Sequence, residues 1–376
     1  MKHFDYIITG GGAAGLLLAY NLAKDSFFKN KTILIIEKED KNSNDRTWCF
    51  WEKGIGEFDH LLTKTWDTAV FKSKNFKKSL ALQPYQYKML RSANLYIFIK
   101  EELSKHAHIS FLKDDVITIK NGKNKTIITT QAHTFTATFC FNSIIFKDVA
   151  KQLKSFPGLQ QHFKGWFIKT TETTFNENEV IFMDFDISQH HNTRFMYVLP
   201  IAKHEALIEY TLFSKKVLPS EEYEQAILNY LQEKNITNFS IEETETGNIP
   251  MSMFNFSKYN SANVIQIGTA GGWTKPSSGY TFKNILRNTD ELVKSLKKGK
   301  PTPIIQQKKY RFYDSMLLKV LLANNGLGSK IFTDLFKKNK PEMIFSFLDE
   351  TSSFAEDLKI ISSLPKLPFL KALFKR

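Results

Sequence analysis

One carboxylate interrupts the strand-like stretch EALIEYTLFS, residues 205–214: Glu209 has apolar and aromatic residues on both sides. β-Branched and aromatic residues at this density are typical of a β-strand. A carboxyl group surrounded by hydrocarbon keeps its proton at pH values where an exposed one is ionised, and a retained proton is what a general acid donates. We therefore predict that Glu209 is a catalytic acid; the plainer alternative is a solvent-facing residue or an ion pair.

Two more acidic residues belong to this part of the chain. Asp184, in the segment FMDF, is expected on a neighbouring strand, where it orients Glu209, accepts a proton or makes a strand-end hydrogen bond. Glu245 precedes a glycine turn at Gly247, and both of its interpretations, lining a cavity and capping a turn, stay open.

The N-terminus has the pattern of a dinucleotide-binding βαβ unit. We expect a buried strand, a glycine turn, a helix and a second strand over residues 4–9, 10–12, 13–24 and 32–37. Gly10, Gly12 and Gly15 form the fingerprint GxGxxG, and Glu37 ends the second strand at the fingerprint's spacing. The glycines permit a tight turn and a close pyrophosphate, the helix N-terminus around Ala14 favours its charge, and Glu37 is placed to bind ribose hydroxyls.

A second glycine-rich turn favours FAD over NAD. It begins at Gly268, follows a strand over residues 264–267 and precedes a helix that starts near Tyr280. We expect the backbone of Gly268, Gly271 and Gly272 to face a flavin, although an ordinary helix cap would have the same sequence. Arg46, just after the second strand, is expected at the phosphates or adenine of FAD, or else in a surface role.

The fold class predicted from these patterns is α/β: a Rossmann-like FAD-binding domain, an antiparallel-sheet substrate domain and a helical C-terminal region. Short strand-like runs between Gly165 and Ser214 indicate four strands of the antiparallel sheet. The expected parts are residues 1–160, residues 161–260 and residues 261–376, the last returning to the FAD domain and ending in a basic tail.

Composition restricts partners and location. The formal charge is +14, and most of it lies after Lys283, interleaved with Leu, Ile and Phe; this favours anionic lipid over nucleic acid, with plain solubility as the alternative. Cys49 and Cys140 have no paired spacing and no His cluster beside them, so we expect a reduced protein without disulfide or metal. No run reaches the roughly 20 apolar residues of a membrane span. We expect a cytoplasmic protein, peripheral on the inner membrane face.

Several segments, taken together, resemble the bacterial FAD-dependent lycopene cyclases. Besides the glycine fingerprint they are DRTWCFWE, FMDF, YVLP, LIEYT, ETGNIPM, IGTAGGWTKPSSGYTF and the C-terminal FLDETSSFAEDLKIISSLPKLPFLKAL. The resemblance implies a hydroxylase-like architecture and an intramolecular lyase or isomerase. Its reaction is non-redox, acid-catalysed closure of the ψ ends of lycopene, or another C40 carotenoid, to β-ionone rings, giving γ-carotene and β-carotene. FAD is implied in its reduced form, with NADPH as the reductant.

The resemblance also bears on individual residues. Glu209 takes the place of the first Glu of a Leu-Glu-Glu-Thr stretch, while Tyr210 replaces the second Glu, which leaves open the group that takes the final proton. Lys275 stands where His is expected, and Thr269 stands where hydroxylases usually have Asp.

A cationic intermediate needs aromatic walls that exclude water. The aromatic residues expected around the substrate are Trp48, Trp51, Tyr197, Trp273 and Tyr280, for each of which plain core packing is the alternative. Two rival functions share the predicted fold: an FAD-dependent monooxygenase or halogenase acting on an apolar substrate, and an FAD-bearing membrane-surface protein without chemistry. Oligomeric state and the number of ends cyclised stay open.

Overall fold

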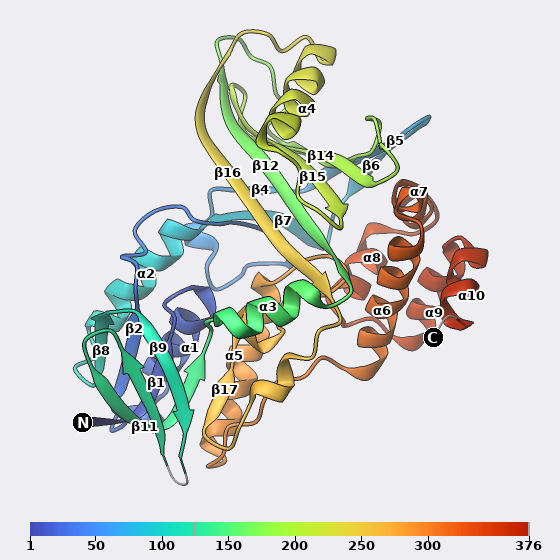
Figure 1. The fold of residues 1–376 in the computed structure, drawn as a ribbon. Coiled ribbons are helices and arrows are strands. Elements are labelled where there is room, and N and C mark those ends of the chain that lie inside the picture. The colour runs from blue at the N-terminus through green and yellow to red at the C-terminus, as the bar shows by residue number, and fades with distance from the viewer. Residues whose placement is uncertain (123–124, 375–376) are drawn as a thin grey trace.

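The computed structural model describes residues 1–122 and 125–374, and its first layer is a seven-stranded sheet in the order β8-β2-β1-β11-β10-β9, with β17 paired to β11 (Figure 1). Its strands are β1 (Lys2–Thr9), β2 (Ile33–Glu37), β8 (Ile109–Lys113), β9 (Val116–Asn121), β10 (Thr126–Thr130), β11 (Thr134–Asn142) and β17 (Val264–Gln266). The helices packed together on one face of this sheet are α1 (Ala13–Lys24), α2 (Ser92–Ser104) and α5 (Phe282–Lys297). The predicted βαβ unit is present, with β1, α1 and β2 within two residues of the expected bounds.

The second layer is another seven-stranded sheet, ordered β16-β12-β15-β14-β13-β5-β6. Its strands are β5 (Thr68–Ser73), β6 (Phe76–Ala81), β12 (Gly158–Thr170), β13 (Glu179–Asp184), β14 (Thr193–Ala202), β15 (Glu205–Ser214) and β16 (Phe239–Ser252). All neighbours are antiparallel except β13 and β5. The four predicted runs form β12 to β15, but the sheet also recruits β5 and β6 from the part expected to bind FAD, and the expected boundary at residue 160 falls inside β12.

A small sheet and a helical region complete the fold. The small sheet has the order β3-β7-β4, with β3 (Thr47–Lys53), β4 (Lys64–Trp66) and β7 (Tyr85–Arg91). The remaining α-helices are α3 (Lys147–Ser155), α4 (Ser220–Glu233), α6 (Lys308–Ala323), α7 (Gly328–Lys338), α8 (Pro341–Leu348), α9 (Phe354–Ser363) and α10 (Lys366–Phe374). Pro341 begins α8, and Pro368 lies within the first turn of α10, where the missing N–H has no intrahelical partner to lose.

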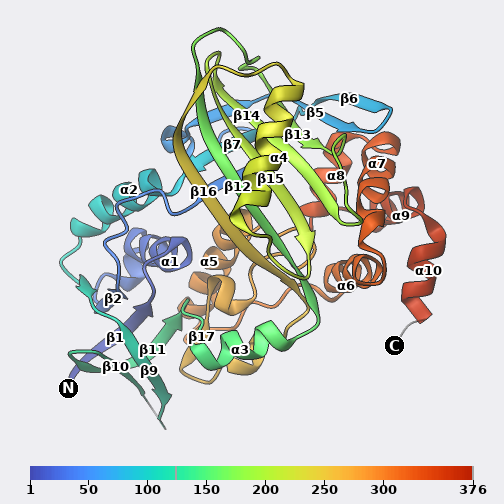
Figure 2. The same ribbon diagram turned by 45° about the horizontal axis from the view of Figure 1, so that its top comes forward.

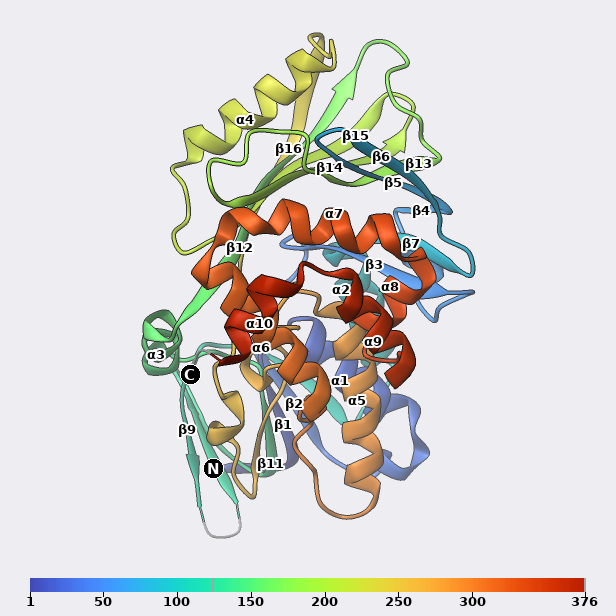
Figure 3. The same cartoon turned by 90° about the vertical axis from the view of Figure 1, so that its right-hand side faces the viewer.

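The two faces of the second sheet are covered by different helices. Figure 2 shows α4 lying across one face, and Figure 3 shows α7 running along the other. The core on the α4 side contains Ile208 and Tyr210 of β15, whereas Leu207 and Phe213 belong to the core on the α7 side. Because side chains alternate along a strand, Glu209 lies on the face opposite α4.

The described residues contain neither a membrane-spanning helix nor a metal-binding cluster. None of the helices there is long and apolar enough to cross a bilayer. Across 1–122 and 125–374, no group of three or more His, Cys, Asp or Glu side chains is arranged to hold a metal ion. Both cysteines are free thiols.

Candidate active site

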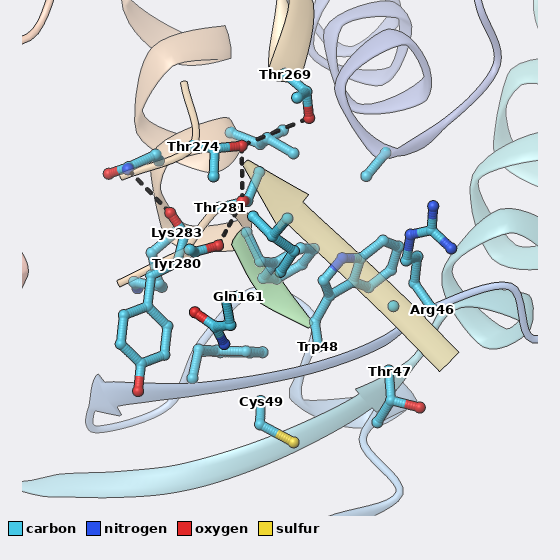
Figure 4. Close-up of a pocket in the computed structure, with 18 of the residues that line it drawn as sticks. Arg46, Thr47, Trp48, Cys49, Gln161, Thr269, Thr274, Tyr280, Thr281 and Lys283 are labelled. Atoms are coloured by element: carbon cyan, nitrogen blue, oxygen red, sulfur yellow. Dashed lines mark hydrogen bonds between the residues drawn. The ribbon is translucent and has the colours of Figure 1, made fainter. Parts of the chain in front are cut away.

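A cavity of about 620 Å³ lies between the first sheet's glycine turns and the α7 face of the second sheet. This volume is in the range of ligand-binding pockets. Residues from distant parts of the sequence line it: Gly12 at the start of α1, Trp48 on β3, Glu209 on β15, Glu245 on β16 and Leu348 at the end of α8. Figure 4 shows the part of the lining formed by β3 and the loop before α5.

The fingerprint glycines have the geometry that their predicted roles require. Gly10 has a φ of +95°, in the left-handed region where glycine is favoured. A Cβ on Gly15 would lie 2.1 Å from the carbonyl oxygen of Gly10, so the helix packs too closely on the turn for any side chain. A Cβ on Gly12 would meet no described heavy atom within 4 Å, because this position borders the cavity. Glu37 accepts a hydrogen bond from the N–H of Gly11 at 2.6 Å.

The second glycine turn meets the first. Gly268 has a φ of +58°, and a Cβ there would lie 2.8 Å from the Cβ of Ala14. Ala14, Gly268 and Thr269 line the cavity, whereas Gly271 and Gly272 lie outside the lining. The structure therefore brings only part of the predicted second-turn set to the cavity.

Besides the glycine turns, the cavity lining has polar groups that are available to a ligand. Arg46 is exposed, lines the cavity and lies on the same side as Trp48 in Figure 4. The Oε1 atom of Gln161 and the Oγ atom of Ser278 are buried in the lining without a hydrogen-bond partner among the described residues. Buried polar atoms without partners are costly, so their position beside a cavity favours a polar ligand.

The far end of the cavity holds a pair of glutamates. Glu209 on β15 and Glu245 on β16 both lie opposite Gly165 of the intervening strand β12. Cross-strand partners share one face of a sheet, and Gly165 has no side chain to separate them. The two carboxyl groups are hydrogen-bonded to each other. The structure thus settles the sequence's open question about Glu245, because this residue lines the cavity.

The environment of this pair keeps a proton on Glu209. Burial raises the pKa of Glu209 to about 8, and the charge of Glu245 adds to this shift. Thr211 donates a hydrogen bond to Glu209 at 2.5 Å, which opposes part of it. Burial also raises the pKa of Glu245, but a 2.6 Å hydrogen bond from Thr47 and the nearby Arg91 guanidinium act in the other direction.

Aromatic side chains line the same cavity. Tyr197 lies directly across from Glu209 on β14, and Tyr280 lies close enough to affect the pKa of Tyr197. Trp51 packs edge-on against Tyr280 at 4.5 Å between ring centroids, and Trp48 stacks on Phe282 at 5.1 Å. All four predicted aromatic residues named here line the cavity.

Trp273 differs from that prediction. It lies outside the cavity lining and is 3% exposed, in the core that α1, α2 and α5 form with the first sheet. Its large apolar surface is used to bury this core, which is the alternative that the sequence left open.

Asp184 also differs, because the structure places it away from Glu209. A register shift between Ile181 and Asp184 brings Asp184 opposite Met196, which belongs to the core on the α4 face. There Asp184 accepts a hydrogen bond from Tyr230 of α4 at 3.0 Å. A β-bulge of this kind changes the face to which a side chain points, so Asp184 cannot orient Glu209 directly.

Lys275, which stands where His was expected, forms a buried cluster of ion pairs. Its Nζ lies 3.1 Å from a carboxylate oxygen of Asp314 and 2.9 Å from one of Glu350, and all three side chains are buried. This cluster ties the loop before α5 to α6 and to the end of α8. Thr269 instead starts a row of hydroxyls with Thr274 and Thr281 along the cavity wall (Figure 4).

Sequence reasoning did not identify several residues of the site. Gly165, Thr47 and Thr211 contribute to the carboxyl pair, and Asp349 lines the cavity with a pKa that burial raises to about 6. A glycine inside a strand-like run, as at Gly165, is a signal of close approach that could have been used.

Comparison with solved structures shows the class of fold. The chain is similar to a geranylgeranyl bacteriochlorophyll reductase-like protein from Thermoplasma acidophilum, with a TM-score of 0.63, 12% identity and coverage of 99% and 98% of the two chains. It is also similar to p-nitrophenol 4-monooxygenase PnpA from Pseudomonas putida (TM-score 0.57, 13% identity, 100% of both chains). Halogenase PltM in complex with phloroglucinol and FAD has a TM-score of 0.56 at 11% identity, over 91% of this chain and 78% of that one. The fold is therefore of the flavin monooxygenase and halogenase class.

Sequence comparison narrows this class to one family. The family model described as lycopene cyclase protein matches residues 5–374. A lycopene beta-cyclase from Pseudescherichia vulneris is 22% identical over 307 residues, which cover 78% of this chain and 75% of the relative. The chain belongs to the lycopene cyclase family.

Proposed function

We propose that this protein closes the linear ψ ends of lycopene, or of another C40 carotenoid, to β-ionone rings, giving γ-carotene and β-carotene. The observation that carries the proposal is the hydrogen-bonded pair of Glu209 and Glu245 in an aromatic cavity. Family membership supports a carotenoid substrate. The reaction isomerises its substrate, so it needs a proton donor and a proton acceptor but no net electron transfer.

The residues at the other end of the cavity fit FAD. Gly12 is open to the cavity, the N-terminus of α1 favours a pyrophosphate, and Arg46 lines the same cavity with a guanidinium that can pair with phosphate. The unpartnered atoms of Gln161 and Ser278 are suited to a polar cofactor. Reduced FAD, with NADPH as the source of its electrons, would supply electron density that stabilises a cationic intermediate. The FAD complex of halogenase PltM, which shares the fold, supports this assignment.

The protein's own residues provide the acid and the surroundings. Glu209 is protonated at neutral pH because burial raises its pKa to about 8, and it donates this proton to the terminal alkene. The resulting cation is attracted by the electron-rich faces of Trp51, Tyr197 and Tyr280. Their apolar surfaces also exclude water, which would otherwise capture the cation.

Delivery of so apolar a substrate requires contact with a bilayer, and we assign this contact to α9 and α10. The large apolar side chains exposed on these helices are Phe354, Leu358, Ile361, Leu367, Leu370, Leu373 and Phe374. Lysines accompany them at positions 359, 366 and 371. Each basic residue near an anionic surface contributes about 1 kcal/mol, and the apolar side chains enter the lipid interface.

Vesicle flotation tests this contact. The full chain is expected to float with anionic vesicles at low salt, and Leu367→Glu with Leu370→Glu is expected to reduce the floating fraction at least fivefold. Ile117→Glu is the matched control, because Ile117 is similarly exposed on β9 of the first sheet. Equal flotation of all three proteins, or none at all, contradicts the assignment.

Pigment analysis tests the function itself. We expect a lycopene-accumulating bacterial host that expresses this chain to form β-carotene, and the same host with Glu209→Gln to retain lycopene. Asp184→Asn is the control carboxyl change, since Asp184 faces α4 rather than the cavity. Full conversion by Glu209→Gln would refute the assigned acid. Consumption of NADPH and oxygen in proportion to product would instead indicate a monooxygenase.

A further inference from the structure

The chain needs a proton acceptor, and the residue after Glu209 cannot be it. Tyr210 points to the α4 face of the second sheet, where its hydroxyl accepts a hydrogen bond from Arg194 at 2.9 Å. Strand alternation sends any residue at position 210 to that face. The acceptor must therefore come from another element that borders the cavity.

Four carboxyl groups of the described residues line the cavity: Asp45, Glu209, Glu245 and Asp349. Asp45 pairs with Lys41 at 2.7 Å and accepts a hydrogen bond from Tyr96 at 2.9 Å, among the residues around the first glycine turn. Asp349 follows α8. Of these groups, Glu245 is the one that is hydrogen-bonded to Glu209.

We propose that Glu245 is the base of the reaction, taking the proton that the cyclised cation releases and returning it through the shared hydrogen bond to Glu209. This inference rests on the proposed function, which it deepens by naming the group that ends the reaction. A base at this place touches the substrate, because Glu245 lines the cavity beside the acid.

The surroundings of the pair assign different protonation states to its members. Thr47 donates to Oε2 of Glu245 at 2.6 Å, and Arg91 lies near enough to lower the pKa of Glu245. Glu243, which also affects Glu245, is itself paired with Arg91 at 2.5 Å. We assign the carboxylate form to Glu245, because the Arg91 guanidinium and the Thr47 hydroxyl lie beside it.

Gly165 makes this exchange possible. It lies on β12 between the two glutamates, and a Cβ there would come within 3.4 Å of both the Cβ and the Cγ of Glu209. Any side chain at this position would enter the space through which the two carboxyl groups meet. Glycine leaves the donor and the acceptor on one surface, facing the same substrate.

The proposed reaction balances in protons and electrons without another reagent. The Glu209 O–H bond breaks as a C–H bond forms at the terminal alkene, and the alkene's electron pair supplies that bond. A second alkene then attacks the cation and closes the ring. A ring C–H bond breaks next, its electrons form the ring double bond, and its proton goes to the carboxylate of Glu245. Transfer of this proton to Glu209 restores the starting pair.

Glu245→Gln tests the inference, because it keeps a group that Thr47 can bind but cannot accept a substrate proton. With the purified full chain, reduced FAD and lycopene in vesicles, we expect turnover to fall at least about 100-fold, in the range of general acid–base effects. Loss of the neighbouring charge should also move the alkaline limit of activity to lower pH. Flavin content and thermal unfolding measure folding separately. Glu245→Asp, which retains a base, should recover part of the activity.

The controls separate this inference from the proposed function. Glu242→Gln makes the same change three residues away on β16, at an exposed position outside the cavity lining, and should keep turnover within about threefold of wild type. If Glu209→Gln is inactive while Glu245→Gln, folded and flavin-loaded, turns over within threefold of wild type, the base assignment is wrong and the cyclase function stands. If the wild type forms no cyclised product, the function itself is wrong.

Discussion

Replacing Glu209 by Gln is expected to stabilise the protein while it removes the acid. The folded protein holds this carboxyl neutral because burial raises its pKa from the ordinary 4.5 to about 8. The unfolded chain, in contrast, releases the proton above pH 4.5 and gains free energy by doing so. The wild-type protein therefore loses stability as pH rises from 4.5 to 8. The Glu209→Gln protein keeps its stability, because Gln has no proton to release in the unfolded chain.

The size of the effect follows from these two values. At pH 7 the unfolded state gains about 3 kcal/mol by ionising a group that stays protonated in the folded state. The same calculation gives about 1 kcal/mol at pH 5 and between 4 and 5 kcal/mol, roughly, at pH 9. Gln can still accept from Thr211 and donate to Glu245, so little hydrogen bonding is lost to offset the gain.

Urea unfolding at pH 5, 7 and 8 measures this difference, with both proteins stripped of flavin. Glu242→Gln on β16 is the control, because Glu242 is exposed and its replacement should change the free energy of unfolding by less than about 0.5 kcal/mol. A Glu209→Gln protein that is less stable than wild type at pH 7, or whose advantage does not grow with pH, would refute the idea of a carboxyl held neutral in the cavity.

Three further outcomes are expected. Turnover should fall about tenfold per pH unit above pH 8 as Glu209 ionises, so a flat vesicle-assay profile to pH 9.5 would contradict its role as the acid. Gly12→Ala should unfold like wild type yet bind FAD at least about tenfold more weakly in a fluorescence titration, because its Cβ projects only into the cavity; undiminished binding would place the cofactor elsewhere. Lys275→Met leaves Asp314 and Glu350 buried without their cation and should cost about 3–5 kcal/mol in urea unfolding, whereas a loss below about 1 kcal/mol would show that the cluster is not held as an ion pair.

Local sequence determined the features that depend on near neighbours along the chain. The βαβ unit was predicted within two residues, because its hydrophobic runs and its glycines act over a single turn. Glu209 stood out for a similar reason, as a carboxylate in an apolar strand whose own neighbours bury it. An FAD-binding part with an antiparallel sheet followed from two glycine turns on either side of a run of strands, and the hydroxylase-like class of the fold followed from the family resemblance.

Tertiary structure decided which side chains meet. Glu245 reaches Glu209 only because β12 pairs with both β15 and β16 and carries Gly165 at the crossing. The bulge in β13 turns Asp184 to the opposite face, and no local pattern in FMDF predicts this bulge. Strand pairing joins residues far apart in sequence, and its register is selected by the packing of whole faces rather than by local propensity. The sequence by itself therefore predicted an acid at Glu209, and only the fold placed Glu245 beside it.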